Sequence, residues 1–305
     1  MRDLLIAVLV LTGGLLSSVG WALEGKPKVV ATFSILGDVV QNVGGDHIDL
    51  TILVGPDGDA HTFEPTPKDI IPISKADVIF ENGLHFEHWL NDLYESSASK
   101  AKRVVVTEGI KPLTLIDLEQ TGGRQQTDEL DPHVWQDVHH VIEMVKQVQK
   151  GLIQADPVHQ KVYEENAQRY IDQLTKLDQW IIKTAASIPP EKRKLITSHD
   201  ALGYFAQRYG FQVIGTVIPS ATTEAEDPSA AEMGKLISLI KSVGVKSLFS
   251  ENIQNPKLIK ALAKDTGAVL APGLYTDALG AKGSEGETYI KMMVHNVKIF
   301  AEYLK

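Results

Sequence analysis

The feature that most constrains the fold is a long segment in the middle of the chain with an uninterrupted helical pattern. After Pro157, residues 158–187 contain neither glycine nor proline, and apolar side chains recur at spacings of three or four residues, as one helical face requires. Asp156 and Pro157 supply a helix start, and Pro189 and Pro190 a stop. About 30 residues span roughly 45 Å, which is longer than a small domain is wide. The segment predicts a rigid helix between two units, although a helix packed across a single domain fits the same pattern.

Short apolar runs that end in turn residues lie on both sides of this segment and alternate with amphipathic stretches, a pattern typical of βα units and parallel sheets. The runs cover residues 29–33, 50–54, 78–81 and 104–107 in the first half, and 195–198, 212–217, 248–251 and 269–271 in the second. We therefore expect an α/β protein with two lobes, each with a four-stranded, mainly parallel sheet flanked by helices. The expected boundaries are 23–155 for the N-terminal lobe, 156–190 for the linking helix and 191–305 for the C-terminal lobe. Residues 122–129 are interpreted as a flexible polar loop.

The first 22 residues have the pattern of a cleaved signal peptide. Arg2 precedes an unbroken aliphatic run over Leu4–Leu11, and Gly20 and Ala22 place small residues at the usual −3 and −1 positions. The apolar stretch is interrupted and too short for a membrane span, which needs roughly 20 apolar residues. A lipoprotein anchor would need a cysteine at the cleavage site, and the sequence has none. We expect a soluble periplasmic protein, exported through the signal peptide, without a lipid anchor and monomeric.

Composition excludes several kinds of chemistry. The chain has 39 acidic and 30 basic residues and a net charge of −9, so it offers no cationic field for nucleic acid. Without cysteine there is no disulfide, thiolate nucleophile, Cys-ligated zinc or iron–sulfur cluster. A transition metal would have to be held by His, Asp or Glu. No hydrolase, P-loop or dinucleotide motif is present, and the adjacent Ser198, His199 and Asp200 cannot form a triad, because neighbours at a strand end point to different sides.

Three of the ten histidines stand in turns or at strand ends. His61 follows the second predicted strand in a turn rich in Gly, Pro and Asp, His133 lies in a turn before a helix, and His199 ends an apolar run. Ligands of α/β sheets bind at such places. Asp277 lies on the loop after the last predicted strand and completes a hypothetical set of four, two from each lobe. Four protein ligands are typical of a site that retains zinc, whereas a catalytic site keeps a position for water.

The other histidines are expected to be solvated or half-buried without a special role. Six lie in amphipathic helical stretches and one, His47, lies in a polar turn. The six are His85, His88, His139, His140, His159 and His295.

Five motifs together resemble one known family. They are residues 58–67 (GDAHTFEPTP), 76–84 (ADVIFENGL), 131–135 (DPHVW), 197–205 (TSHDALGYF) and 274–277 (LYTD). Over essentially the whole mature chain, the sequence resembles the metal-binding solute-binding proteins of bacterial ABC importers, the zinc-, manganese- and iron-uptake group. The resemblance implies two α/β lobes joined by a long helix, no enzymatic activity, and a divalent metal ion held between the lobes for delivery to an ABC permease in the inner membrane. It also implies that His61, His133, His199 and Asp277 are the metal ligands.

The resemblance also bears on the identity of the metal. Manganese and iron members often carry Glu at the third ligand position, whereas this chain has His199 in a Ser-His-Asp context that looks like the zinc type. Three imidazoles and one carboxylate suit Zn²⁺ better than Mn²⁺, which prefers more oxygen ligands. Many zinc members also have a His-rich acidic loop before the second ligand, but residues 122–130 contain no histidine, so Mn²⁺ stays open as the alternative cargo. Binding is expected to weaken as the pH falls through about 6.5, because the imidazoles then take up protons.

Two alternative functions fit the same residues. A secreted zinc-dependent hydrolase would use Glu64 or Glu251 as its base, and a metal-containing adhesin would hold the ion as a structural element. In the carrier hypothesis, Glu251 and Asp137 are instead expected to support metal-bound histidines from behind.

Overall fold

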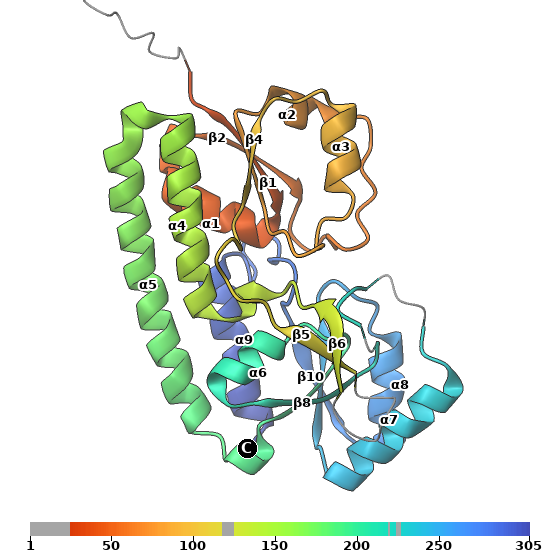
Figure 1. Cartoon of the computed structure of the whole chain (residues 1–305). Helices are drawn as coiled ribbons and strands as arrows, with labels where there is room; N and C mark the ends of the chain where they lie inside the picture. The colour runs from red at the N-terminus through yellow and green to blue at the C-terminus, as the bar shows by residue number, and fades with distance from the viewer. Residues whose placement is uncertain (1–24, 118–124, 219, 224–226) are drawn as a thin grey trace, which may run out of the picture.

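The computed structural model describes residues 25–117, 125–218, 220–223 and 227–305, and for 115–117 and 125–128 it describes the backbone alone. The predicted signal peptide, residues 1–22, lies outside the described residues. Figure 1 shows two α/β lobes stacked end to end beside one long helix. No helix in the described ranges combines the length and apolar character needed to cross a membrane.

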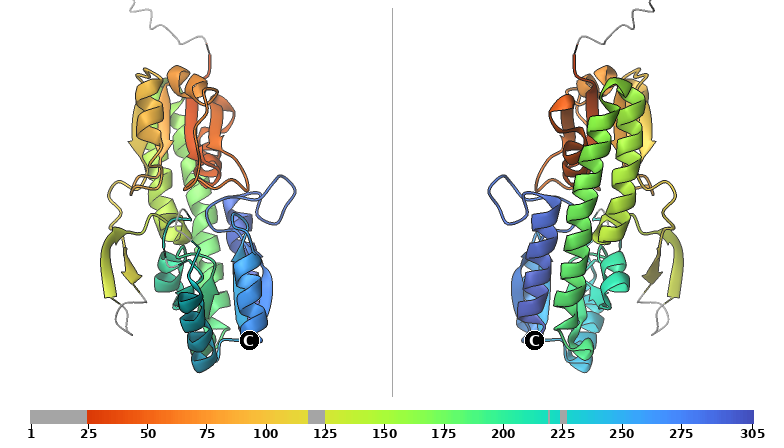
Figure 2. Two further views of the ribbon diagram at one scale, coloured as in Figure 1. Left: turned by 90° about the vertical axis from the view of Figure 1, so that its right-hand side faces the viewer. Right: turned by 90° about the vertical axis from the view of Figure 1, so that its left-hand side faces the viewer.

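The first lobe contains a parallel sheet in the strand order β2-β1-β3-β4. The strands are β1 (Lys28–Phe33), β2 (Asp49–Val54), β3 (Val78–Glu81) and β4 (Lys102–Val105), and they match the four predicted runs within two residues. Helices α1 (Ser34–Gly44) and α4 (Val138–Ala155) cover one face of the sheet, whereas α2 (Ile70–Lys75) and α3 (Leu90–Ser96) lie on the other side (Figures 1 and 2). Because all four strands run in one direction, the loops after their carboxyl ends gather at the edge that faces the second lobe.

The second lobe has the four predicted strands but not the predicted continuous sheet. Its strands are β7 (Lys194–Thr197), β8 (Gln212–Thr216), β9 (Ser247–Glu251) and β10 (Val269–Leu274). They form two separate parallel pairs, β7–β8 and β9–β10, with β7 packed beside β9. Beyond Thr197, the backbone N–H groups of Ser198 and His199 donate to the Glu251 carboxylate at the end of β9. The Glu251 side chain therefore accepts the backbone N–H groups that follow β7, at a position where a neighbouring strand would otherwise accept them.

Helices surround these strands, and an unpredicted hairpin stands beside them. The helices are α6 (Gly203–Tyr209), α7 (Ala230–Val243), α8 (Lys257–Thr266) and α9 (Tyr289–Tyr303). The hairpin pairs β5 (Thr114–Asp117) with β6 (Gln125–Leu130) in antiparallel register (Figure 2). Much of the predicted flexible loop is thus a strand. Its polar sequence lacks the alternation of apolar and polar residues by which a half-buried strand is recognised.

The predicted long helix is confirmed as α5 (Gln160–Ala186). Its start differs from the prediction, because Asp156 is followed by the short 3₁₀ turn Pro157–His159 and α5 begins after that turn. The predicted apolar face is buried along its whole length: Tyr163, Ala167, Tyr170, Leu174, Leu177, Ile181 and Ala185. Helix α5 packs against α1 and α4 in the first lobe and against α6 and α9 in the second. One hydrophobic core consequently continues from the first sheet along α5 to the aromatic cluster around Phe205 and Phe300.

Candidate metal centre

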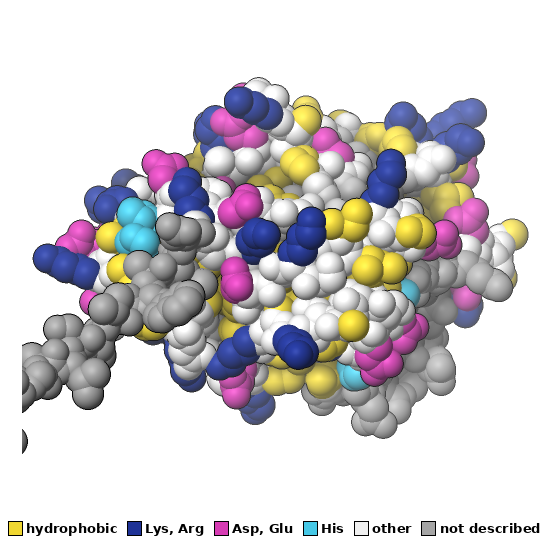
Figure 3. All heavy atoms as spheres, turned by 90° about the horizontal axis from the view of Figure 1, so that it is seen from above, with side chains coloured by type: hydrophobic (Ala, Val, Ile, Leu, Met, Phe, Trp, Pro, Cys, Tyr) yellow, Lys and Arg dark blue, Asp and Glu magenta, His cyan; other side chains and the backbone are white. Residues whose placement is uncertain are grey.

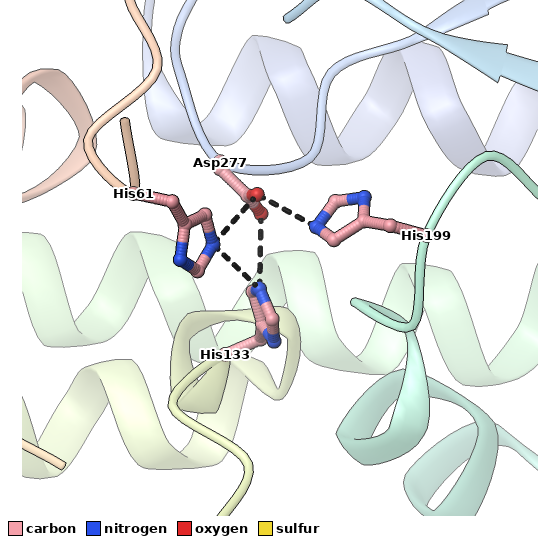
Figure 4. A group of neighbouring side chains, drawn as sticks. All are labelled: His61, His133, His199 and Asp277. Carbon is pink, nitrogen blue, oxygen red and sulfur yellow. Dashed lines mark hydrogen bonds and ion pairs between the residues drawn. The ribbon is translucent and has the colours of Figure 1, made fainter. Parts of the chain in front are cut away.

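The structure brings together all four residues predicted as ligands. His61 lies on the loop after β2, His133 immediately before the 3₁₀ turn Val134–Gln136, His199 on the loop after β7, and Asp277 on the loop after β10. One potential ligand atom from each lies within 4.8 Å of those from the other three. Figure 4 shows the three imidazoles converging on the Asp277 carboxylate from three sides. All four side chains are buried, with 4% of the surface of His61 exposed and none of the other three.

The distances among these donor atoms match those around a single small ion. The His199 Nε2 atom lies 2.8 Å and the His61 Nε2 atom 3.3 Å from Asp277 Oδ2, and the His133 Nε2 atom lies 3.6 Å from Asp277 Oδ1. The Nε2 atoms of His61 and His133 are 3.3 Å apart. Ligand atoms about 2.0–2.1 Å from a tetrahedral zinc ion would be about 3.3 Å from one another. The four side chains therefore need only small adjustments to coordinate one ion.

Two buried carboxylates orient the imidazoles from behind. The Nδ1 atom of His133 is 2.8 Å from Asp131 Oδ1, and the Nδ1 atom of His199 is 2.6 Å from Glu251 Oε2. A proton held on Nδ1 leaves the Nε2 lone pair directed at the centre, as metal-bound histidines require. Glu251 was predicted for such a role. The sequence interpretation missed Asp131, although its place two residues before His133 could have suggested it.

Asp137, predicted as a second support, has a different role. Its carboxylate accepts the His139 backbone N–H as the N-cap of α4, and it lies 3.1 Å from the Arg208 guanidinium. Of the two candidate bases of the hydrolase hypothesis, Glu64 is exposed to solvent, and the Glu251 carboxylate lies 2.6 Å from the Nδ1 atom of His199.

Hydrogen bonds from the first lobe fix the loop that carries Asp277. The Trp135 indole N–H and the Gln136 side-chain amide both donate to the Thr276 carbonyl, at 2.8 Å each. On the opposite side, the Thr276 hydroxyl donates to Glu251 at 2.8 Å. Groups from both lobes thus hold the residue next to Asp277.

Comparison with known proteins places the chain in one family. Residues 29–303 match the family described as "ZnuA: Zinc-uptake complex component A periplasmic". The protein belongs to this family. Its members are metal-binding substrate-binding proteins of ABC metal importers and not enzymes, which confirms the resemblance and rules out the hydrolase alternative.

Individual relatives support this assignment along nearly the full length. The ZnuA-family chain is 34% identical over 277 residues to the manganese-binding lipoprotein MntA of Halalkalibacterium halodurans, covering 91% of this chain and 88% of MntA. It is 33% identical to the manganese ABC transporter substrate-binding lipoprotein PsaA of Streptococcus mitis, covering 92% of this chain and 89% of PsaA. The solved structure of the periplasmic zinc-binding protein TroA from Treponema pallidum superimposes with a TM-score of 0.82 at 31% identity, covering 92% of this chain and 99% of TroA. The predicted α/β fold with its long helix is therefore confirmed.

In the absence of a metal ion, the charged groups in the centre of this ZnuA-family protein determine which of its side chains are protonated. Burial lowers the pKa of His133, but the charges of Asp277 and Asp131 outweigh it and raise that pKa to about 9. Burial likewise lowers the pKa of His199, and Glu251 and Asp277 reverse the effect and raise it well above its usual range. Burial raises the pKa of Asp277, yet His199 and His133 hold it well below its usual range. Burial dominates at His61, whose pKa is lowered.

The acceptor oxygens of Asp277 show that the centre is suited to a cation. Both oxygens are buried, and neither accepts a hydrogen bond of ordinary geometry from the described residues. A buried carboxylate is costly unless it is paired with a cationic group or binds a metal ion. A divalent ion among three imidazoles would satisfy them, so the donor set fits the transition metals for which imidazole is a preferred ligand.

Proposed function

We propose that the protein is the extracytoplasmic carrier that binds one divalent transition metal ion through His61, His133, His199 and Asp277 and delivers it to an ABC importer. Family membership supports the transport role, and the convergence of three Nε2 atoms on one buried carboxylate supports the ligand set. The proposed boundaries are a lobe over 23–155, the linking segment 156–190 and a lobe over 191–305. With two ligands from each lobe, release of the ion would follow a small separation of the lobes along α5.

Zn²⁺ is the proposed cargo and Mn²⁺ the second candidate. Three imidazoles and a carboxylate favour zinc by ligand type, and TroA is described as zinc-binding. Two observations support manganese. Both Asp277 oxygens face imidazoles, so the carboxylate could supply a second oxygen ligand, and MntA and PsaA are described as manganese-binding. A site that selects manganese in the cell would still bind zinc more tightly in vitro, so affinity alone does not identify the cargo.

The test combines the native metal content with binding by variants. Protein isolated from its own extracytoplasmic compartment is analysed for metals, and the stripped protein is titrated with Zn²⁺ and with Mn²⁺. We expect one equivalent of zinc in the isolated protein and at least a 100-fold loss of zinc affinity in His133→Ala and His199→Ala. His139→Ala, a change at an exposed histidine on α4, is the matched control and should bind normally. Manganese in the isolated protein would overturn the zinc assignment alone, whereas normal binding by both site variants would overturn the ligand set.

Chelation separates a carrier from an adhesin with a structural metal. One hydrophobic cluster runs along α5 and a second lies within the C-terminal lobe, and both are built of protein side chains alone. We therefore expect the stripped protein to stay folded, with a lower unfolding temperature, and to rebind metal. Loss of the near-UV circular dichroism signal on chelation would favour the structural role.

The proposed location is the periplasm without a lipid anchor, with a monomeric carrier. MntA and PsaA are named as lipoproteins, but the printed 305-residue sequence contains no cysteine to which a lipid could be attached. Fractionation of cells should release the protein with the soluble periplasmic contents, and recovery with the membranes after a salt wash would contradict this proposal. Sedimentation should give the mass of a single chain.

A further inference from the structure

A second group of metal-ligating side chains lies at the far end of the first lobe. His47 ends the 3₁₀ turn Gly45–His47 that follows α1, and His159 ends the turn before α5. Their ring centroids are 4.4 Å apart with the planes tilted by 44°. The end of the molecule where α4 meets α5 faces the viewer in Figure 3, in which histidine side chains lie on the surface. His47 is half-buried, and the His159 side chain is 39% exposed.

These two rings are closer together than any two imidazoles of the buried centre. There, the ring centroids are 5.3 Å (His133–His199), 5.4 Å (His61–His133) and 6.0 Å (His61–His199) apart, and the pair at 5.4 Å has its Nε2 atoms only 3.3 Å apart. The His47 and His159 rings, 4.4 Å apart, are therefore within the range of separations at which imidazoles share one point in the buried centre. The separation of the turns thus already suits two ligands.

One ring is also oriented by a buried carboxylate. The Nδ1 atom of His159 is 2.6 Å from Asp156 Oδ2, an oxygen that also accepts the Tyr163 hydroxyl at 2.6 Å. Asp156 is 7% exposed, so its position is fixed by packing. If this contact holds the proton on Nδ1, the Nε2 atom of His159 is left as an acceptor on a side chain that is 39% exposed. The buried centre uses the same arrangement in Asp131–His133 and Glu251–His199.

We propose that His47 and His159 form a second, exchangeable site for a late divalent transition metal ion such as Zn²⁺, with water in the remaining coordination positions. Two imidazoles and no directly placed carboxylate select for Zn²⁺, Ni²⁺ or Cu²⁺ and against Mn²⁺. Solvent access on one side makes the site weaker than the buried centre and quick to exchange. The proposal does not depend on the function of the buried centre, because the two groups share no residue.

Equilibrium dialysis of the full chain against micromolar Zn²⁺, with the bound metal measured by mass spectrometry, tests the site. We expect wild type to bind one equivalent more than His47→Asn or His159→Asn, and Asp156→Asn to bind the additional equivalent about ten-fold more weakly, as loss of a supporting carboxylate does elsewhere. The control His139→Asn should keep the additional equivalent, and Mn²⁺ should not supply it.

The measured quantity is the difference between wild type and variant in the number of zinc equivalents bound per chain. If the buried centre binds no zinc, every protein loses one equivalent and this difference stays the same. Nuclear magnetic resonance of the wild type provides a measurement that needs no variant. Titration with zinc should shift the ring signals of His47 and His159 together, whether or not the buried centre takes up an equivalent of its own. The proposal is overturned if the variants retain the additional zinc, or if those two signals do not move.

Discussion

The metal-free centre is predicted to carry two protons that an incoming metal ion must displace. The His199 imidazole lies between two carboxylates, with Nδ1 2.6 Å from Glu251 and Nε2 2.8 Å from Asp277. His133 lies between Asp131 and Asp277, which raise its pKa to about 9 against the effect of burial. The pKa of His61 is lowered by burial, so that ring is neutral near pH 7. At pH 7 the empty site therefore holds imidazolium at His133 and His199 and carboxylate at Asp277.

The sign and size of the pH effect follow from these pKa values. Because metal binding needs neutral imidazole, affinity is lost as the pH falls below a raised pKa, by ten-fold or about 1.4 kcal/mol per unit and per proton. Between pH 9 and pH 7, protonation of His133 should by itself lower the affinity roughly 50-fold, and protonation of His199, whose pKa is also raised, adds to this loss. With ordinary imidazoles of pKa about 6.5, the affinity would change by only about two-fold over this interval. The structure thus moves the start of the decline from the value of about 6.5 expected from sequence to about 9.

Competition calorimetry with a chelator, at several pH values and in two buffers of different ionisation heat, measures the zinc affinity and the number of protons released on binding. We expect about two protons released per Zn²⁺ at pH 7. Glu251→Gln is the matched variant, since it removes the charge behind His199 while an amide oxygen can still accept the Ser198 and His199 N–H groups. Because one of the two charges that raise the pKa of His199 is removed, this variant should release fewer protons. Constant affinity between pH 7 and pH 9, with fewer than one proton released at pH 7, would refute the reasoning.

Two further predictions concern groups away from the ligands. Burial raises the pKa of Glu87 from 4.5 to about 7. The free energy of unfolding in urea should therefore fall by about 3 kcal/mol as the pH rises from 4.5 to above 7. Glu87→Gln should remove this decline, and a variant with the same pH profile as wild type would contradict the prediction. Trp135→Phe removes one of two donors to the Thr276 carbonyl, at a cost of about 1 kcal/mol. It should speed metal release to a chelator several-fold in stopped-flow measurements, and an unaltered rate would show that Gln136 suffices.

The local pattern of apolar and polar residues was sufficient to predict the strands of both lobes and the long helix. The strands were visible as short apolar runs because a strand in a parallel sheet is buried on both faces, as β3 is along its whole length. Helix α5 was visible because its buried residues recur with the helical period on a solvent-exposed background. Pattern failed at β6, whose polar residues carry no burial signal, and at the β7–β9 boundary, where a side chain replaces backbone pairing.

The sequence by itself determined which residues could coordinate a metal: without cysteine, ligation falls to imidazoles and carboxylates, and strand ends and turns hold three of the imidazoles away from helix flanks. Only the tertiary structure decided that four donors spread over 217 positions, from His61 to Asp277, converge on one buried point. It alone paired Asp131 with His133 and the predicted support Glu251 with His199, gave Asp137 to a helix cap, and placed His47 beside His159. The physical reason is that pKa values and coordination depend on distances of a few ångströms between segments remote in sequence, and no local periodicity encodes those distances.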